Sequence, residues 1–162
     1  MFYQENNALM WRYGDENLRI EPWGRDALRV RATLTAWPAD QDWALLPREE
    51  TGCEICIDEA GASIRNGRMT AFIDRHGRLT VKNAEGKTLL REYREPKEFP
   101  EVRGREWRPI LNGNFELTVR FDANDGEMIY GMGEYQQPLL NLKGAVLDLA
   151  QRLKLDVDTK YG

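Results

Sequence analysis

The chain has 162 residues, about the length of one ordinary domain, and its 41% hydrophobic residues can form a core but contain no membrane-spanning run. A formal net charge of −4 argues against a nucleic-acid partner, because binding to the phosphate backbone needs a clustered cationic face. Five tryptophans exclude a disordered chain. The first residues lack the basic start and apolar run of a secretory signal, so we expect a globular, cytoplasmic protein with no membrane partner.

Two β-rich segments, 18–24 and 26–37, open the series of predicted strands. In the second segment, apolar side chains alternate with polar ones at Leu28, Val30, Ala32 and Leu34. Strict alternation of this kind is typical of a strand with one buried face.

The two cysteines, Cys53 and Cys56, have the C-x-x-C spacing of a redox pair or of half a zinc site. No second cysteine pair is present to complete a tetrahedral site. The alternation of Cys53, Ile55 and Ile57 indicates a strand, in which residues three apart point to opposite faces. We therefore expect two reduced cysteines and no structural metal.

Five turn dipeptides give the strongest regularity in the chain: Asn66-Gly67, His76-Gly77, Glu85-Gly86, Asn112-Gly113 and Asp125-Gly126. Glycine accepts positive φ without a steric penalty, so such dipeptides favour the tight turns between antiparallel strands. The segments between them are β-rich, at 62–66, 69–75, 78–83, 87–93, 115–121 and 127–131. Short strands at this spacing predict an all-β, antiparallel β-sandwich or barrel.

Segment 115–121 carries the clearest alternation, with Phe115, Leu117, Val119 and Phe121 on one face, and is predicted to be half-buried. The segment 94–108 interrupts the pattern with two prolines and many charges, and we expect it to be a long connection between sheets. Segment 142–155 fits helical spacing and also alternates, so the residues alone leave helix and strand open.

The sequence offers no catalytic triad, because His76 is the only histidine and lies in a predicted turn. A glycine-dense segment at 125–137 stands out instead. It indicates a strand that ends in a loop, bent at Gly131 and Gly133, that presents a carboxylate, a phenol and an amide at Glu134, Tyr135 and Gln136. Such a loop suits a hydroxyl-rich ligand, although the glycines equally suit a bulge or sheet crossover.

A family resemblance follows from the order of NGRMTAFIDRHGRLTV, GKTLLREYRE and FDANDGEMIYGMGEYQQPLLNLKGAVLDLAQR. This order is similar to the amino-terminal domain of glycoside hydrolase family 31, which includes α-glucosidases and α-xylosidases. The resemblance covers most of residues 9–152. Its most specific part is Y-G-M-G-E followed by L-N-L-K-G, and the wording is most like the bacterial α-xylosidase branch.

The resemblance implies a β-sandwich of the galactose-mutarotase-like type that packs on a catalytic (β/α)8 barrel. In that family the barrel supplies two aspartates for retaining cleavage of α-linked sugars. No position of this chain matches either aspartate, so we expect no catalytic residue, no cofactor and no activity from the chain alone. The resemblance also implies extended structure for 142–151 and a loop at Gly131, Gly133, Glu134, Tyr135 and Gln136 that faces the barrel or its sugar.

The expected organisation is an amino-terminal β-sandwich domain over 1–152 and an atypical tail over 153–162, where the sequence departs from the family. The favoured function is an accessory domain whose partners are the barrel and an α-linked oligosaccharide. The alternatives are a stand-alone carbohydrate-binding or structural module, and a mutarotase-like epimerase, which the shortage of histidine disfavours. Unpaired strand edges predict self-association.

Overall fold

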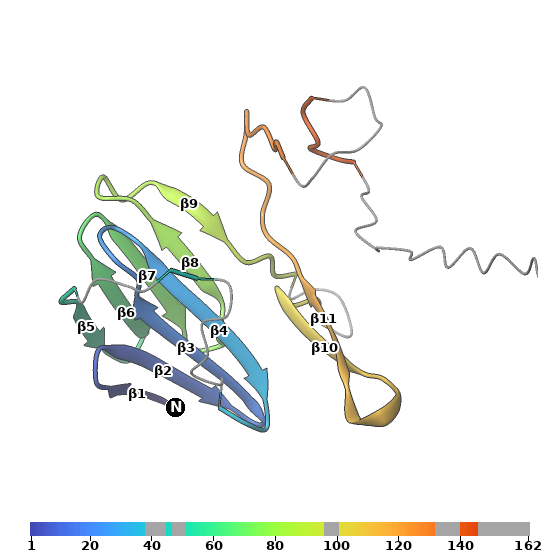
Figure 1. Cartoon of the computed structure of the whole chain (residues 1–162), viewed down its shortest axis with the longest axis horizontal. Coiled ribbons are helices and arrows are strands. Elements are labelled where there is room, and N and C mark those ends of the chain that lie inside the picture. The colour runs from blue at the N-terminus through green and yellow to red at the C-terminus, as the bar shows by residue number, and fades with distance from the viewer. Residues whose placement is uncertain (38–44, 47–50, 96–100, 132–139, 146–162) are drawn as a thin grey trace, which may run out of the picture. The chain divides into compact units, whose positions relative to one another are not determined.

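The computed structural model describes residues 1–37, 45–46, 51–95, 101–131 and 140–145. The chain divides into two compact units, residues 1–122 and 123–162. The first unit contains every regular strand of the described residues (Figure 1). The predicted boundary at 152 lies outside the described residues and stays a prediction, as does the tail over 153–162.

The first sheet has four antiparallel strands that follow one another in chain order. They are β1 (Phe2–Glu5), β2 (Ala8–Tyr13), β3 (Glu16–Pro22) and β4 (Leu28–Leu34). The segments 18–24 and 26–37 contain β3 and β4, as predicted, whereas the sequence pattern missed β1 and β2. Their connection turns at Asn6, which holds φ at +52° without a glycine.

The second sheet has five antiparallel strands, also in chain order. They are β5 (Glu54–Ile57), β6 (Gly61–Asn66), β7 (Met69–Asp74), β8 (Leu79–Lys82) and β9 (Thr88–Arg91). No helix in the described part of the chain is long and apolar enough to cross a membrane.

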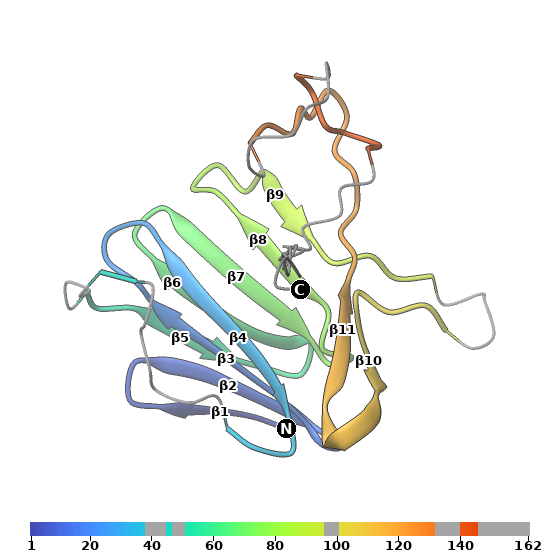
Figure 2. The same ribbon diagram turned by 45° about the vertical axis from the view of Figure 1, so that its right-hand side comes forward.

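A separate two-stranded ribbon joins β10 (Arg105–Pro109) to β11 (Phe115–Val119) through a 3-10 turn, η1 (Leu111–Gly113). An isolated bridge between Glu92 and Phe121 connects the ribbon to the end of β9 (Figure 2). On either side of this bridge, the amide of Tyr93 donates to the carbonyl of Arg120 at 2.9 Å and the amide of Asp122 to the carbonyl of Arg91 at 2.8 Å.

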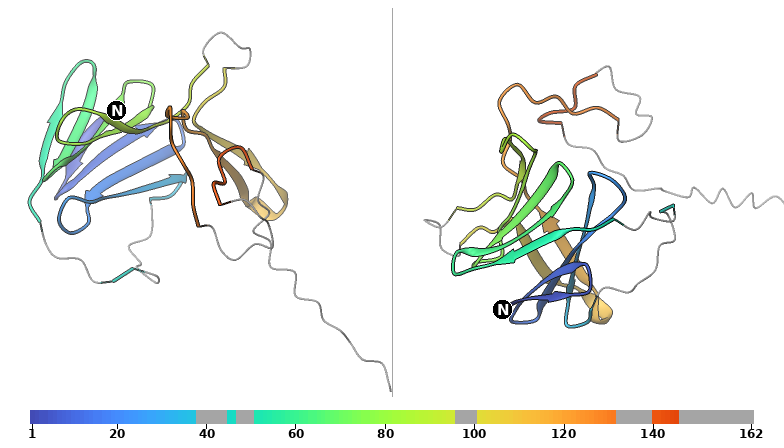
Figure 3. Two further views of the ribbon diagram at one scale, coloured as in Figure 1. Left: turned by 90° about the horizontal axis from the view of Figure 1, so that it is seen from above. Right: turned by 90° about the vertical axis from the view of Figure 1, so that its left-hand side faces the viewer.

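The core lies between the inner faces of the two sheets, which Figure 3 shows side by side. Its buried members come from β2, β3, β6, β7 and β8: Leu9, Trp11, Leu18, Ile20, Ala62, Ile64, Ala71, Ile73 and Leu79. Burial of so many apolar side chains supplies the main stabilising free energy of a sandwich. The predicted antiparallel β-sandwich is confirmed.

The turn dipeptides behave as predicted at four positions, where 66–67, 76–77, 85–86 and 112–113 each connect consecutive strands. Both Asn112 and Gly113 have positive φ, as a tight hairpin turn requires. A turn also forms at 125–126, but the prediction of a strand over 127–131 is wrong. The prediction that all of 94–108 is a connection is also wrong, because β10 begins at Arg105.

Gly77 occupies a position that no other residue fits. It holds φ at +82°, and a Cβ placed there would lie 2.3 Å from the indole ring of Trp11. Gly86 has a similar φ of +78°, but open space surrounds it.

We expect Gly77→Ala to lower the free energy of unfolding by about 3 kcal/mol, because backbone strain and overpacking against Trp11 add together. Gly86→Ala is the matched control and should cost only about 1 kcal/mol, from strain alone. Urea unfolding of both variants measures the difference. Equal losses would contradict the close packing of Trp11 on the β7–β8 turn.

Candidate functional site

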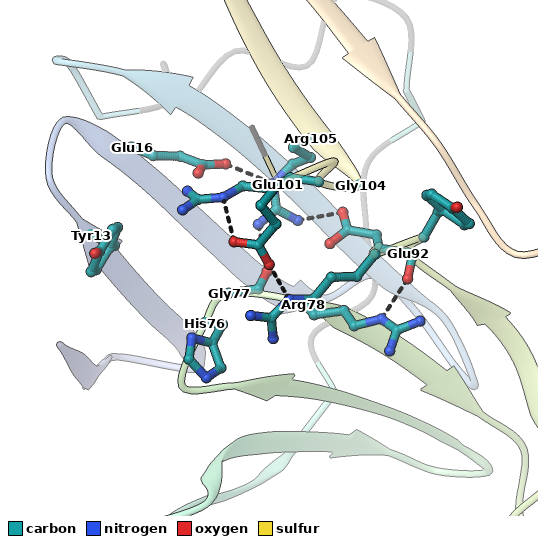
Figure 4. Close-up of a pocket in the computed structure, with 12 residues that line it drawn as sticks. Tyr13, Glu16, His76, Gly77, Arg78, Glu92, Glu101, Gly104 and Arg105 are labelled. Atoms are coloured by element: carbon teal, nitrogen blue, oxygen red, sulfur yellow. Dashed lines mark hydrogen bonds and ion pairs between the residues drawn. The ribbon is translucent and has the colours of Figure 1, made fainter. Parts of the chain in front are cut away.

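A small pocket of about 60 Å³ lies where the β7–β8 turn, the end of β9 and the start of β10 meet (Figure 4). Its lining is almost entirely polar and charged. The residues fall into a buried group around Arg105 and a more exposed rim that includes Tyr13, His76, Arg94 and Glu101.

The guanidinium of Arg105 occupies the centre of the buried group, with only 7% of its side chain exposed. Its Nε donates to Glu16 Oε1 at 2.7 Å, its Nη2 donates to the carbonyl of Gly77 at 2.7 Å, and its Nη1 donates to Glu92 Oε1. It also lies 5.8 Å from the ring centroid of Trp11. One cation therefore joins β3, the β7–β8 turn, the end of β9 and the ribbon.

Glu92 is the most deeply buried carboxylate of this group, with 4% of its side chain exposed. Its Oε2 accepts the amide hydrogen of Leu79 at 2.9 Å. Burial raises the pKa of Glu92, although Arg105 and the Leu79 amide act in the opposite direction. Gly104 allows this packing, because a Cβ there would lie 2.5 Å from Glu92 Cβ.

The rim of the pocket contains a second set of ion pairs. Arg94 Nε donates to Glu101 Oε1 at 2.5 Å, and this hydrogen bond lowers the pKa of Glu101. Arg78 donates to the carbonyl of Glu92 at 2.6 Å and to Asp122 Oδ2 at 3.1 Å. Because the cations and carboxylates of the pocket bind one another, the site joins strands rather than presenting a free acid or nucleophile.

The described residues contain no group of three or more His, Cys, Asp and Glu side chains placed to hold a metal ion. Both cysteines are free, and Cys53 donates its thiol hydrogen to the carbonyl of Asn7. His76 is exposed in the β7–β8 turn, as predicted, and its amide donates to Asp74 Oδ1 at 2.8 Å.

Gly131 is the one residue of the predicted glycine loop that the structure describes, and its φ of +92° is the left-handed conformation expected of it. Gly133, Glu134, Tyr135 and Gln136 lie outside the described residues.

The segments on either side of this loop are joined in the second unit. Asn141 Oδ1 accepts from the amides of Ile129 and Lys143, at 3.0 and 3.1 Å. The amide of Leu142 donates to the carbonyl of Ile129 at 2.8 Å, and Lys143 Nζ donates to the carbonyl of Asn124 at 2.6 Å. Leu142 belongs to neither helix nor strand, and the rest of segment 142–155 is described only to residue 145. The base of the loop is therefore closed by hydrogen bonds.

The Arg105 cluster could not be recognised from the sequence. Arg105 and Glu16 are 89 residues apart, and Arg105 lies in a segment that its charges and prolines predict to be a connection. The only trace of the cluster in the sequence is the run of acidic and basic residues around β10. Such a run does not reveal whether its side chains are solvated or buried.

Comparison with known proteins gives a consistent result, although no family model matches the chain. An uncharacterized family 31 glucosidase from Pseudescherichia vulneris is 40% identical over 162 residues, which cover 90% of this chain and 31% of the relative. Alpha-xylosidase A from Aspergillus niger is 26% identical over 168 residues, and the match covers 91% of this chain and 23% of that relative.

Solved structures agree with these relatives. The crystal structure of a GH31 α-xylosidase from a soil metagenome, complexed with xylose, matches 94% of this chain with a TM-score of 0.84 and 38% identity. A GH31 α-xylosidase from Xanthomonas citri shares the fold, with a TM-score of 0.72 at 22% identity.

The chain is therefore an antiparallel β-sandwich that is similar to part of proteins of the glycoside-hydrolase class. More specifically, the chain is homologous to the amino-terminal domain of glycoside hydrolase family 31. It spans about a third of the first curated relative and a quarter of the first matched structure.

Substitution of Glu92 tests the buried cluster. Glu92→Leu removes one of the three acceptors of Arg105 and the acceptor of the Leu79 amide, and should cost about 3 kcal/mol of unfolding free energy. Glu92→Gln keeps one acceptor oxygen, for either Arg105 or the Leu79 amide, and should cost less, about 2 kcal/mol. Glu106→Gln, on an exposed ion pair with Arg120, is the control and should change stability by less than about 0.5 kcal/mol.

The free energy of unfolding should depend on pH in a direction that the raised pKa of Glu92 determines. A raised pKa means that the folded chain binds the Glu92 proton more tightly than the unfolded chain does. Its stabilising contribution is complete below the ordinary value of 4.5 and is lost as pH rises through the higher folded pKa. Relative to Glu92→Gln, the native chain should therefore lose stability in urea unfolding as pH rises from 4.5. A constant difference would contradict the burial of this carboxyl.

Proposed function

We propose that the chain is the accessory β-sandwich domain of a family 31 retaining α-glycosidase and that it supports the active-site pocket of a catalytic barrel. The observation that carries this proposal is the asymmetry of coverage. The matches include 90% and 94% of this chain but only 31% and 25% of the family 31 proteins. The chain therefore corresponds to one domain of a larger enzyme rather than to a diverged whole enzyme.

The chemistry of the described carboxylates supports an accessory role. Retaining hydrolysis uses two carboxyl groups about 5–5.5 Å apart, one as nucleophile and one as acid and base. In this chain Glu16 and Glu92 are held by Arg105, and Asp122 is held by Arg78 and Arg91. A carboxylate neutralised in this way is a poor nucleophile toward a sugar, so the proposal assigns both catalytic groups to the barrel.

The glycine loop is the part of the chain that we propose to line the sugar pocket or to face the barrel. Its residues are Gly131, Gly133, Glu134, Tyr135 and Gln136. Support comes from the hydrogen bond between Ile129 and Asn141, which joins the segments on either side of the loop, and from side chain types that can hydrogen-bond sugar hydroxyls. An α-linked oligosaccharide is the proposed ligand, in keeping with the xylose in the soil-metagenome relative.

We also propose a cytoplasmic location and self-association through strand edges. The two free thiols fit a reducing compartment.

The proposed self-association rests on unpaired strand edges. In the first sheet β1 and β4 are the terminal strands, so each has one edge that no other strand of the sheet pairs.

The isolated chain should not hydrolyse aryl α-glucosides or α-xylosides above a buffer blank, because it supplies neither catalytic carboxyl. A hybrid in which this chain replaces the matching region of the soil-metagenome α-xylosidase should hydrolyse the α-xyloside. Turnover by the isolated chain that disappears when one of its own carboxylates is changed would overturn the proposal. A folded but inactive hybrid would also count against it. Binding of the isolated chain to glycans would favour the stand-alone module.

In the same hybrid, Glu134→Ala should lower kcat/KM for the α-xyloside by about tenfold with little change in Tm, because a lost sugar contact weakens substrate use and not folding. Glu127→Ala is the control, since it is a carboxylate outside the proposed loop. If Glu134→Ala instead lowers Tm and leaves the kinetics intact, the loop is scaffold and the pocket assignment is wrong.

A further inference from the structure

The ribbon of β10 and β11 has two chemically different faces. Residues directly opposite each other in an antiparallel pair project to the same side. On one face, Arg108 Nε donates to Glu116 Oε2 at 2.9 Å and Arg120 Nη1 donates to Glu106 Oε2 at 2.8 Å. This face satisfies its own charges and is suited to water.

The opposite face is apolar beyond its first residue, Arg105. The register pairs Trp107 with Leu117 and Pro109 with Phe115, and Val119 pairs with Arg105. We call this surface the ribbon face, made by Trp107, Pro109, Phe115, Leu117, Val119 and Phe121. Four side chains of this face, those of Phe115, Leu117, Val119 and Phe121, are 41–43% exposed. By contrast, Leu9 and Leu18 in the sandwich core are 0% exposed.

An apolar face of this kind needs a cover. A two-stranded ribbon is marginally stable in water unless one face packs on something else, and a continuous exposed apolar patch marks an interaction site. Here Arg105 and the Glu92–Phe121 bridge hold the base of the ribbon against the two sheets of the first unit. The base of the ribbon is therefore attached, Trp107 is partly buried, and the four side chains from Phe115 to Phe121 on this face remain 41–43% exposed.

We propose that the ribbon face is the surface on which the catalytic domain of a family 31 chain docks. This inference rests on the proposed function. The matched α-xylosidase carries the same fold as 25% of its chain, so three quarters of that chain lie outside the match and are available as cover. The six residues of the ribbon face carry no charge, and the charge of the neighbouring Arg105 is paired with Glu16 and Glu92. The face therefore fits an apolar partner surface.

The area of the face favours a domain of the same chain over a second copy. Four side chains that are 41–43% exposed leave roughly 300 Å² of accessible surface, against the roughly 800 Å² per partner of a stable complex between separate molecules. A contact between tethered domains needs less area, because the linkage raises the effective concentration of the partner.

The experiment measures protection of a thiol placed on the ribbon face. Leu117→Cys and the control Ile57→Cys are made both in the isolated chain and in the soil-metagenome hybrid, since Leu117 and Ile57 are 41% and 44% exposed. Iodoacetamide labelling is followed site by site with mass spectrometry, and the exposed Cys56 serves as an internal reference. Labelling at 117 should be about tenfold slower in the hybrid than in the isolated chain, while labelling at 57 should change less than about twofold.

Three results would overturn the inference. Equal labelling at 117 in both proteins would show that the catalytic domain does not cover the face. Protection in the isolated chain that grows with concentration would assign the face to a second copy. Protection in the isolated chain at every concentration would assign it to residues 123–162. The α-xyloside assay separates the two proposals, because an active hybrid without protection refutes only the docking surface, and a protected but inactive hybrid refutes only the proposed function.

Discussion

The arrangement of the first unit depends on the buried guanidinium of Arg105. Its partners come from β3 in one sheet and from the β7–β8 turn and the end of β9 in the other. Removing an arginine from water is costly, and the cost is offset only where several acceptors in good geometry surround it. Two carboxylates and one carbonyl meet that condition here. The planar fork of the guanidinium then fixes directions that an ammonium group would leave free.

Aliphatic packing alone would hold the two sheets together without positioning the ribbon. The core cluster is drawn from β2, β3, β6, β7 and β8, and no residue of β10 or β11 belongs to it. The orientation of the ribbon therefore depends on polar contacts, which are short-ranged and directional, rather than on apolar burial, which is not directional. A surface that must meet a second domain in one geometry benefits from such an attachment.

The sequence predicted most of this fold because turn chemistry and alternation are local. Asn112-Gly113 forms its turn with positive φ at both residues, as that dipeptide favours. β1 and β2 were missed because their turn at Asn6 contains no glycine, and β10 was missed because charges and prolines surround it. The Arg105 cluster could not be predicted, since its pairing with Glu16 depends on tertiary structure that brings together residues 89 apart. Alternation in β11 predicted the strand and its apolar face correctly, but the prediction that this face is buried is wrong, because its side chains are 41–43% exposed in the structure.

The exposed apolar side chains are unevenly distributed along the chain. The aliphatic side chains at the inner faces of the two sheets are buried in a shared core, whereas Val30, Leu46, Ile57 and Leu89 are at least 39% exposed. From Ile110 onward, large apolar side chains are instead exposed on the ribbon face and, in the second unit, near the glycine loop, as at Met128, Tyr130 and Leu140. Exposure of this extent is not needed for solubility or folding, and it costs free energy in water. It is explained if the two sheets serve as the scaffold, the Arg105 cluster attaches the ribbon to them, and the exposed apolar residues after Ile110 serve as contacts for the proposed catalytic domain.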